Sequence, residues 1–341
     1  MEEFGLCVKR LLRSDRKNKN DKKIKGLGLN ISLISAIIQG LSIMKNFSHN
    51  NPENIMQPFY SSDLVARSLV RVGIPRYKAY KITHDIWEEM GTKHKDEKVL
   101  VRKVLKVLKE KYPQLVSPYR DWRKIMKHKK PLIILIGGAT GIGTSTLAVR
   151  LGWLLEINHI LGSDSVREII RQFMPQEITP ILNVSTYQTD NFVKHVKSHK
   201  DGLIYGFISQ SDKVIYGIAA IIKRAIKEKE SMVIEGVHLV PGEMNFLEKY
   251  KDDAVIVPII LDVNKEETHK EHFFSRHVQN KDRSSDKYLK YFAEIRLIRD
   301  YLVQQAGKFH VPVIENYNMR KVEEEVLTKI YARFFSPKKN S

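Results

Sequence analysis

Cysteine is almost missing from this chain of 341 residues. The one cysteine, Cys7, excludes an internal disulfide framework and any zinc site built on several thiolates, which is typical of a reducing cytosol. We therefore expect a cytoplasmic protein. Acidic residues are also scarce, with 39 Asp and Glu against 58 Lys and Arg, and the formal net charge is +19. Such an excess favours anionic partners, which can be nucleic acid, an anionic membrane or small polyphosphates.

Motifs for nucleic-acid recognition are missing as well, since the sequence contains no RNP segment and no zinc knuckle. A nucleic-acid partner is therefore not expected from motifs, although the charge keeps it open. Residues 27–44 carry no charge and follow the basic segment RSDRKNKNDKKIK, as a signal anchor would. Polar residues dilute this stretch and no cleavage site follows it. We expect a docked or poorly ordered helix there rather than a membrane span, while a membrane contact stays open.

The chain divides into three predicted parts. Residues 1–56 form a basic, weakly apolar extension. Residues 57–118 carry apolar side chains at helical spacing and predict three helices, the first of which ends at Gly73 and Pro75. Residues 119–341 alternate between short apolar runs and helical patterns. The length is sufficient for two folded domains, and the sequence leaves the oligomeric state open.

Five apolar runs in the third part predict buried strands. They are Leu132–Ile136, Ile157–Leu161, Met232–Glu235, Val255–Leu261 and Val311–Ile314. Strands that alternate with helices imply a doubly wound parallel sheet, whose ligands bind beyond the carboxyl ends of the strands. A helix is expected over Ser211–Glu228, with Ser211 as its N-cap.

The segment LIILIGGATGIGTSTL, residues 132–147, places a glycine-rich turn between a strand and a helix. Gly138, Gly141 and Gly143 allow successive N–H groups and the helix N-terminus to point at an anion. This order of features predicts a phosphate-binding loop, or P-loop, that holds ATP. The alternative is an ordinary glycine-rich turn of an α/β domain.

The hydroxyl residues Thr144, Ser145 and Thr146 complete the predicted nucleotide site. Ser145 falls where a P-loop hydroxyl binds Mg²⁺. Thr144 occupies the position of the usual lysine, so the positive charge for the β- and γ-phosphates must come from elsewhere, or the loop does not turn nucleotide over.

Two predicted strand ends carry carboxylates. Asp164 follows the second strand, ahead of Arg167 and Arg171 on one helix face, so an Asp base and two arginines that clamp an anionic substrate are expected. The alternative is a helix cap with two solvated arginines. Glu235 ends the third strand as a Walker B carboxylate does, and it is the predicted partner of Ser145 in holding Mg²⁺. Its alternative is a strand-end carboxylate with a backbone partner.

The basic stretch HFFSRHVQNKDR, residues 272–283, lies where P-loop kinases carry a lid. Arg276 and Arg283 are the predicted sources of the charge that Thr144 lacks, acting on the transferred phosphoryl group. Lys194, in the long insert after the second helix, is a predicted substrate contact. For the basic stretch 272–283, the alternative is a solvated basic helix without a catalytic role.

Five ordered segments together resemble archaeal 2-phosphoglycerate kinases. They are IGGATGIGTSTLA, GSDSVREIIRQ, VIEGVHLVPG, the basic stretch that ends in IRLIRDYL, and VPVIEN. The segment PFYSSDLVARSLVRVGIPRYKAYKITHDIWEEM is similar to an ATP-cone module. The resemblance covers about residues 57 to 320. It implies transfer of the γ-phosphoryl group of ATP to the 3-hydroxyl of 2-phosphoglycerate, which gives 2,3-bisphosphoglycerate, a precursor of the cyclic solute made by some methanogens. In this family a threonine at the P-loop lysine position is a usual variant.

Other functions stay open on the residues alone. A P-loop kinase could act on another small anionic metabolite or on a nucleoside. A catalytically silent nucleotide sensor would fit the missing lysine, and an RNA-binding P-loop protein would fit the net charge.

Overall fold

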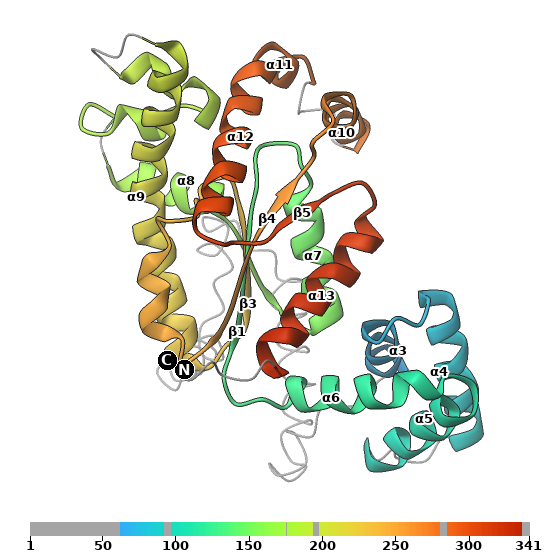
Figure 1. Ribbon diagram of the computed structural model, residues 1–341. Coiled ribbons are helices and arrows are strands. Elements are labelled where there is room, and N and C mark those ends of the chain that lie inside the picture. Colours follow the sequence, from blue (N-terminus) through green and yellow to red (C-terminus); the bar gives the residue numbers. More distant parts are fainter. Residues whose placement is uncertain (1–61, 92–96, 175, 194–197, 280–284, 336–341) are drawn as a thin grey trace, which may run out of the picture. The chain divides into compact units, whose positions relative to one another are not determined.

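A computed structural model describes residues 62–91, 97–174, 176–193, 198–279 and 285–335, without the side chains of residues 275–279 and 285 (Figure 1). Several predictions lie outside the described residues: the extension 1–56, the uncharged stretch 27–44, Lys194, Arg283 and the side chain of Arg276. Among the described helices, none combines the length and the apolarity that crossing a membrane requires.

A five-stranded parallel sheet lies at the centre of the fold. The strands are β1 (Leu132–Gly137), β2 (His159–Gly162), β3 (Met232–Gly236), β4 (Val255–Asp262) and β5 (Val313–Glu315). Their order is β2-β3-β1-β4-β5, and every pair is parallel. The predicted doubly wound sheet is therefore confirmed. All five carboxyl ends meet at one edge, where Gly137 pairs with Gly236 and Gly162 with Glu235.

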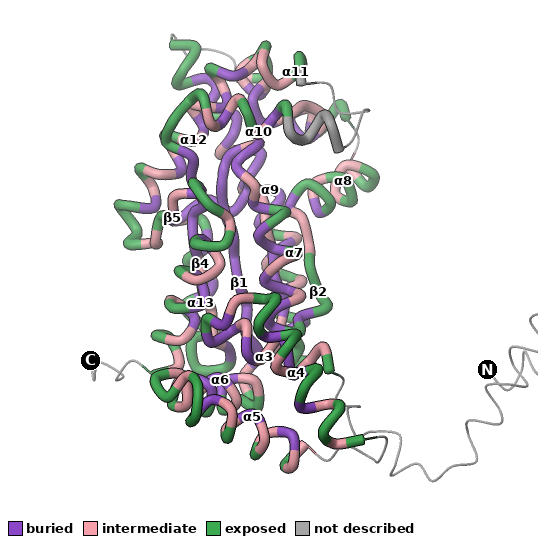
Figure 2. Tube along the Cα trace, turned by 90° about the vertical axis from the view of Figure 1, so that its right-hand side faces the viewer, coloured by how far each residue is buried: buried purple, intermediate pink, exposed green. Residues whose placement is uncertain are grey.

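Helices cover both faces of the sheet. They are α7 (Thr144–Leu155), α8 (Ser163–Phe173), α9 (His199–Glu228), α10 (Glu266–Gln279), α11 (Ser285–Lys290), α12 (Phe292–Lys308) and α13 (Met319–Phe335). Figure 1 shows α7 and α13 on one side and α9 on the other. Ile134 of β1 packs in the same cluster as Leu147 of α7, whereas Ile133 packs with Val214 of α9. Strand β1 is buried along its whole length (Figure 2), as a strand covered on both faces must be.

Four short 3₁₀ segments lie between helices and strands of the described chain. They are η2 (Pro113–Leu115), η3 (Pro180–Asn183), η4 (Thr186–Phe192) and η5 (Asn245–Tyr250). η3 and η4 form the insert between α8 and α9, and both contact α9.

Four helices precede the sheet: α3 (Ser62–Arg71), α4 (Arg76–Met90), α5 (Glu97–Lys111) and α6 (Val116–Met126). The three helices predicted within residues 57–118 are present as α3, α4 and α5. Buried Arg71 donates from Nε to the carbonyl oxygen of Leu154 (2.7 Å) and pairs with Glu156, so this segment is fastened to the far end of α7. α6 continues through residue 118, and the division of the chain there stays a prediction.

The predicted start of the long helix is wrong. α9 begins at His199, and Ser198 is its N-cap, because the Ser198 hydroxyl accepts from the N–H of Asp201 at 3.4 Å. Ser211 lies in mid-helix and is fully buried. The apolar stripe continues upstream through Leu203 and Phe207, and its burial outweighs the capping preference of Ser211.

Candidate active site

The glycine turn between β1 and α7 has the backbone that the sequence requires. Gly141 and Gly143 have φ angles of +92° and +101°, a left-handed conformation that favours glycine. A Cβ atom on Gly138 would lie 2.8 Å from the carbonyl oxygen of Leu261, which is too close. The chain therefore runs tightly over the end of β4 and enters α7 at Thr144, with the helix N-terminus facing the turn.

Side chains from distant elements hold this loop by its carbonyl groups. Asn316, which follows β5, donates to the carbonyl of Ile142 at 2.8 Å. His269 of α10 bonds the carbonyl of Thr140 through Nε2 at 2.9 Å, so Nε2 carries the proton. Burial lowers the pKa of His269 to about 4 and keeps the ring neutral. With these carbonyls occupied, the loop N–H groups are the groups left for an anion.

Two hydroxyl groups at the start of α7 converge on one carboxylate. Thr144 donates to Oε2 of Glu235 at 2.7 Å, and Ser145 donates to Oε1 at 2.9 Å. A Cβ atom on Gly162 of β2 would lie 3.1 Å from that same Oε1. The structure thus brings Ser145 and Glu235 together, as a shared metal site requires. Hydroxyl and carboxylate oxygens are the donors that Mg²⁺ prefers, so this set fits the ion. Thr146, the third hydroxyl residue, is exposed on the first turn of α7.

Asp164 lies in the first turn of α8, and Gly162 rather than Asp164 occupies the N-cap. The Asp164 carboxylate is largely exposed, with 71% relative exposure, and Arg167 approaches it at 3.4 Å. Arg167 also donates to the carbonyl of Val184 at 2.6 Å. Arg171 instead pairs with Glu168 on its own helix at 2.5 Å. The structure therefore brings Arg167, but not Arg171, into contact with Asp164.

A buried polar network beneath Asp164 is a feature that the sequence did not indicate as a site. His238 is fully buried, with Nδ1 2.9 Å from the Ser163 hydroxyl and Nε2 3.2 Å from Oε1 of Gln210. Because an amide oxygen only accepts, Nε2 carries the proton and Nδ1 accepts from Ser163. Burial lowers the pKa of His238 to about 4, so the ring stays neutral.

This network joins three segments of the site. Gln210 of α9 donates from Nε2 to the carbonyl of Val184 at 3.1 Å, the same carbonyl that Arg167 binds. Gly236 has a φ of +132°, and a Cβ atom there would lie 2.1 Å from the Ser163 hydroxyl oxygen. The turn that carries Asp164 is consequently fixed against the end of β3 and the insert.

An ion pair fixes the end of β4. Asp262 is buried, and Arg299 of α12 binds both of its carboxylate oxygens, with Nε at 2.7 Å from Oδ1. This pairing raises the pKa of Arg299 above its usual value. The neighbouring Arg296 donates to the carbonyls of Val263 and Asn264 at 2.7 and 2.8 Å. α12 is thereby anchored to the edge of the sheet that carries the P-loop.

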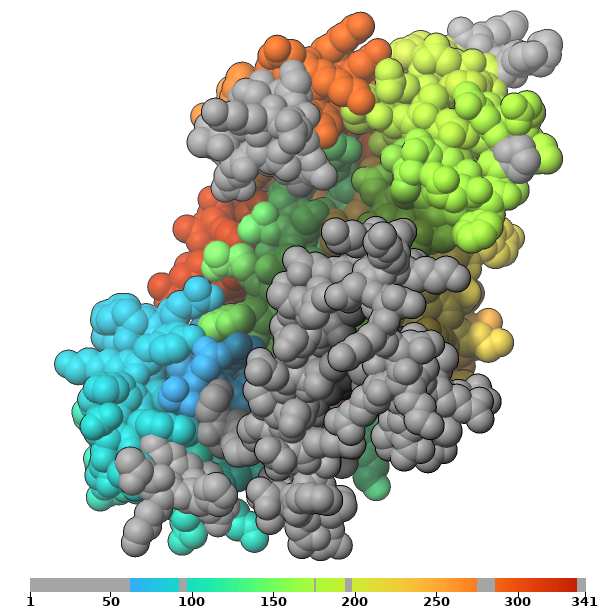
Figure 3. Space-filling model, turned by 180° about the vertical axis from the view of Figure 1, so that it is seen from behind, coloured from blue at the N-terminus to red at the C-terminus, as the bar shows by residue number. Residues whose placement is uncertain are grey.

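Aromatic rings connect the P-loop to the helices and the insert around it. Phe273 of α10 lies against Gly141, and its ring stacks on Tyr288 of α11 at 5.1 Å. Tyr187 of η4 is buried and packs on Tyr291 at 5.3 Å. Figure 3 shows the corresponding surfaces, the yellow-green insert and the orange helices, side by side.

The chain is similar in sequence to known proteins over most of its length. The 2-phosphoglycerate kinase of Methanopyrus kandleri is 33% identical over 279 residues, which cover 80% of this chain and 84% of the relative. The 2-phosphoglycerate kinase of Methanocaldococcus jannaschii is 35% identical, and the match covers 88% of that relative. The 2-phosphoglycerate kinase of Pyrococcus horikoshii is 34% identical, and the match covers 91% of that relative. No family model matches the chain. Among solved structures, a shikimate kinase from Acinetobacter baumannii in complex with shikimate matches 63% of this chain and 99% of its own, with 18% identity and a TM-score of 0.35.

Proposed function

Because the chain belongs to the family of 2-phosphoglycerate kinases, we propose that it transfers the γ-phosphoryl group of ATP to 2-phosphoglycerate. The products are 2,3-bisphosphoglycerate and ADP. The observation that carries the proposal is the convergence of the Thr144 and Ser145 hydroxyls on Glu235 beside the glycine turn. This is the arrangement that phosphoryl transfer needs, since such catalysis is mostly positioning and charge stabilisation.

The P-loop is the proposed site of the ATP phosphates. The N–H groups of Gly141, Gly143 and Thr144 would bind phosphate oxygens at the N-terminus of α7. Ser145 and Glu235 would hold Mg²⁺, which neutralises charge on the phosphates when bound. The exposed hydroxyl of Thr146 is a further proposed contact for the nucleotide.

Asp164 is the proposed base. Its carboxylate would accept the proton of the substrate's 3-hydroxyl as the oxygen of that group bonds to the γ-phosphorus. The bond from that phosphorus to the bridging oxygen breaks, and its electron pair leaves with ADP. Arg167, which already lies beside Asp164, would bind the anionic substrate, and Arg171 and Lys194 are further candidates.

The charge missing at Thr144 remains to be supplied. A threonine side chain is neutral, and the Thr144 hydroxyl donates its hydrogen bond to Glu235. Thr144 therefore supplies no positive charge to the phosphates. Arg276 and Arg283 stay the predicted sources. Replacing either with alanine should lower kcat far more than it raises the KM for ATP, because the charge acts on the transition state.

We further propose that residues 57–118 form an ATP-cone-like module. Its contact with α7 runs through Arg71, which binds the Leu154 carbonyl and Glu156. Arg71→Ala should change the dependence of the rate on ATP while leaving the KM for 2-phosphoglycerate unchanged. Arg102→Ala, on an exposed position of α5, is the matched control. An unchanged ATP dependence in Arg71→Ala would reduce the module to a structural role.

The experiment that tests the proposed function is a substrate panel. Purified protein with Mg-ATP is given 2-phosphoglycerate, 3-phosphoglycerate, glycerate or a nucleoside, and ADP formation is measured. We expect the highest kcat/KM with 2-phosphoglycerate. Equal values for the two phosphoglycerates, or turnover of a nucleoside alone, would contradict the proposal. ATP that binds without turnover would indicate a nucleotide sensor instead.

A further inference from the structure

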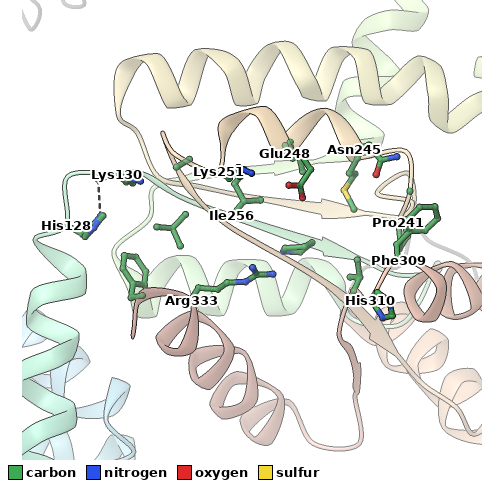
Figure 4. A pocket seen from close by; sticks show the side chains of 18 residues that line it. His128, Lys130, Pro241, Asn245, Glu248, Lys251, Ile256, Phe309, His310 and Arg333 are labelled. Atoms are coloured by element: carbon green, nitrogen blue, oxygen red, sulfur yellow. Dashed lines mark hydrogen bonds between the residues drawn. The ribbon is translucent and has the colours of Figure 1, made fainter. Parts of the chain in front are cut away.

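A cavity lies at the opposite edge of the sheet from the P-loop. It has a volume of about 540 Å³ and is bordered by the amino end of β4, by Lys130 just before β1 and by His310 just before β5 (Figure 4). Parallel strands place these amino ends at one edge, so this cavity shares no residue with the candidate active site. Its volume is in the range of sites that hold a small organic molecule.

The charge around this cavity is predominantly positive. Its lining includes Lys130, Lys251 and Arg333 with the two histidines His128 and His310, and Glu248 is its only carboxylate. Figure 4 shows Lys251 and Glu248 reaching into the space from the η5 side and Arg333 from the α13 side. Within the described part of the chain, the three cations form no ion pair. Cations gathered without partners repel one another and gain energy from an anion placed among them.

Most of the remaining lining residues are apolar, and they are firmly held. Ile256 and Pro258 of β4 are only half-buried, although β4 is an inner strand of the sheet. Phe309 forms one wall, and its ring lies directly on Gly242, where a Cβ atom would come within 2.4 Å of it. At the other end the His128 ring contacts Phe334 edge to face at 5.1 Å, and its Nδ1 accepts from the N–H of Lys130. The cavity thus has an apolar floor and a cationic rim.

We propose that this cavity binds an organic phosphate of nucleotide size. Lys130, Lys251 and Arg333 would bind the phosphate, since these are the groups proteins use for phosphoryl oxygens. A flat apolar portion of the ligand would lie on Ile256 and Pro258 against Phe309. Glu248 and Asn245 lie on the same rim and would accept hydroxyl hydrogen bonds. Inorganic phosphate alone would leave the apolar floor uncovered, so a larger molecule fits better.

Pyridoxal 5′-phosphate and pyridoxal are a matched pair of probes for this cavity. Both carry an aldehyde that condenses with a lysine amine, releasing water, and borohydride reduces the imine to a stable secondary amine. Only the first carries a phosphate. Peptide mapping of the full chain then gives the labelling rate at each lysine, which separates this cavity from any labelling at the P-loop. AMP is added in a parallel series as a competitor.

Pyridoxal is largely closed to a hemiacetal by its own 5′-hydroxyl and labels every lysine more slowly, so each preference for pyridoxal phosphate is divided by that of Lys223, exposed on α9. We expect this relative preference to be about tenfold at Lys130 or Lys251, and AMP should suppress it. Arg333→Glu should abolish the relative preference, whereas Arg102→Glu on α5 should leave it intact. A relative preference near one at Lys130 and Lys251 in the unaltered protein would overturn the proposal, as would a relative preference that survives Arg333→Glu.

Discussion

The two edges of the sheet differ in how their polar side chains are partnered. At the carboxyl edge, hydroxyls meet a carboxylate at Glu235, an amide holds the loop at Asn316, and His238 has a partner on each ring nitrogen. At the amino edge, the side chains of Lys130, Lys251 and Arg333 border an open cavity and form no ion pair with a described residue.

This difference separates two kinds of site. A catalytic site must hold its groups within a fraction of an ångström of the reactive geometry, and mutual hydrogen bonds among side chains achieve this before substrate arrives. Unpaired cations are loosely placed and strongly solvated, so they suit binding of an anion rather than chemistry on it. We therefore expect small substitutions at the carboxyl edge to lower kcat strongly, and substitutions at the amino edge to change kcat little.

The largest effect is expected from Glu235→Gln. The substitution removes the negative charge that two hydroxyls and the proposed Mg²⁺ share, which is worth several kcal/mol in the transition state. We expect kcat to fall on the order of 10³-fold at saturating Mg²⁺. Glu230→Gln, at an exposed carboxylate just before β3, is the matched control and should retain its rate. Near-normal turnover in Glu235→Gln would remove this residue from the site.

A smaller loss is expected from Gly141→Ala. The new Cβ would occupy a left-handed position 2.5 Å from the Phe273 ring, so the loop must shift. A shift of about 1 Å at a reacting group costs on the order of 10² in rate. Gly73→Ala is the control, because Gly73 has a φ of +94° with no atom within 4 Å of the added Cβ. If both variants lose activity equally, backbone strain rather than loop position is responsible.

The buried histidines predict how stability depends on pH. The pKa values of His238 and His269 are lowered to about 4, so below pH 6.5 the unfolded chain binds protons that the native chain does not. The free energy of unfolding should therefore be highest above pH 6.5 and fall between pH 6.5 and 4, by roughly 3 kcal/mol for each histidine.

Denaturant titrations at several pH values give the slope of the unfolding free energy against pH, which is proportional to the number of protons taken up on unfolding. His238→Gln should lower that number by about one. His84→Gln, on the exposed face of α4, controls for the loss of a histidine. A slope unchanged by His238→Gln would mean that this ring is charged in the native protein.

The smallest effect is expected at the amino edge. Lys251→Glu changes an exposed side chain far from the P-loop, and kcat should stay within about twofold of the unaltered protein. The thermal midpoint should change little for the same reason. A large loss of kcat in the absence of added organic phosphate would show that the two edges are not independent.

The sequence predicted the sheet and the meeting of Ser145 with Glu235 for one physical reason. One apolar run ends at Glu235, another ends just before the glycine turn that leads to Ser145, and the carboxyl ends of parallel strands meet at one edge. Thr144 is predicted as a nucleotide contact that lacks the usual lysine charge, but its contact with Glu235 is not, because a spacing pattern does not give the direction of a hydroxyl group. In the structure that hydroxyl is the second donor to Glu235.

The network around His238 could not be predicted in the same way. Ser163, Gln210 and His238 come from three separate segments, and only the folded chain brings them together. One signal was present, since Gln210 and Ser211 interrupt the apolar stripe of α9 at buried positions. That interruption resembles a helix start, which is why the beginning of α9 was placed too late.

The central claim is that the carboxyl edge of the sheet moves a phosphoryl group from ATP to the 3-hydroxyl of 2-phosphoglycerate. ³¹P NMR of a reaction containing the full chain, Mg-ATP and 2-phosphoglycerate follows that group directly. The account predicts loss of the γ-phosphate signal together with one new phosphomonoester signal on carbon 3, while the phosphate on carbon 2 is retained, and almost none of this in Glu235→Gln. Release of inorganic phosphate without a new ester, or equal ester formation in Glu235→Gln, would contradict it.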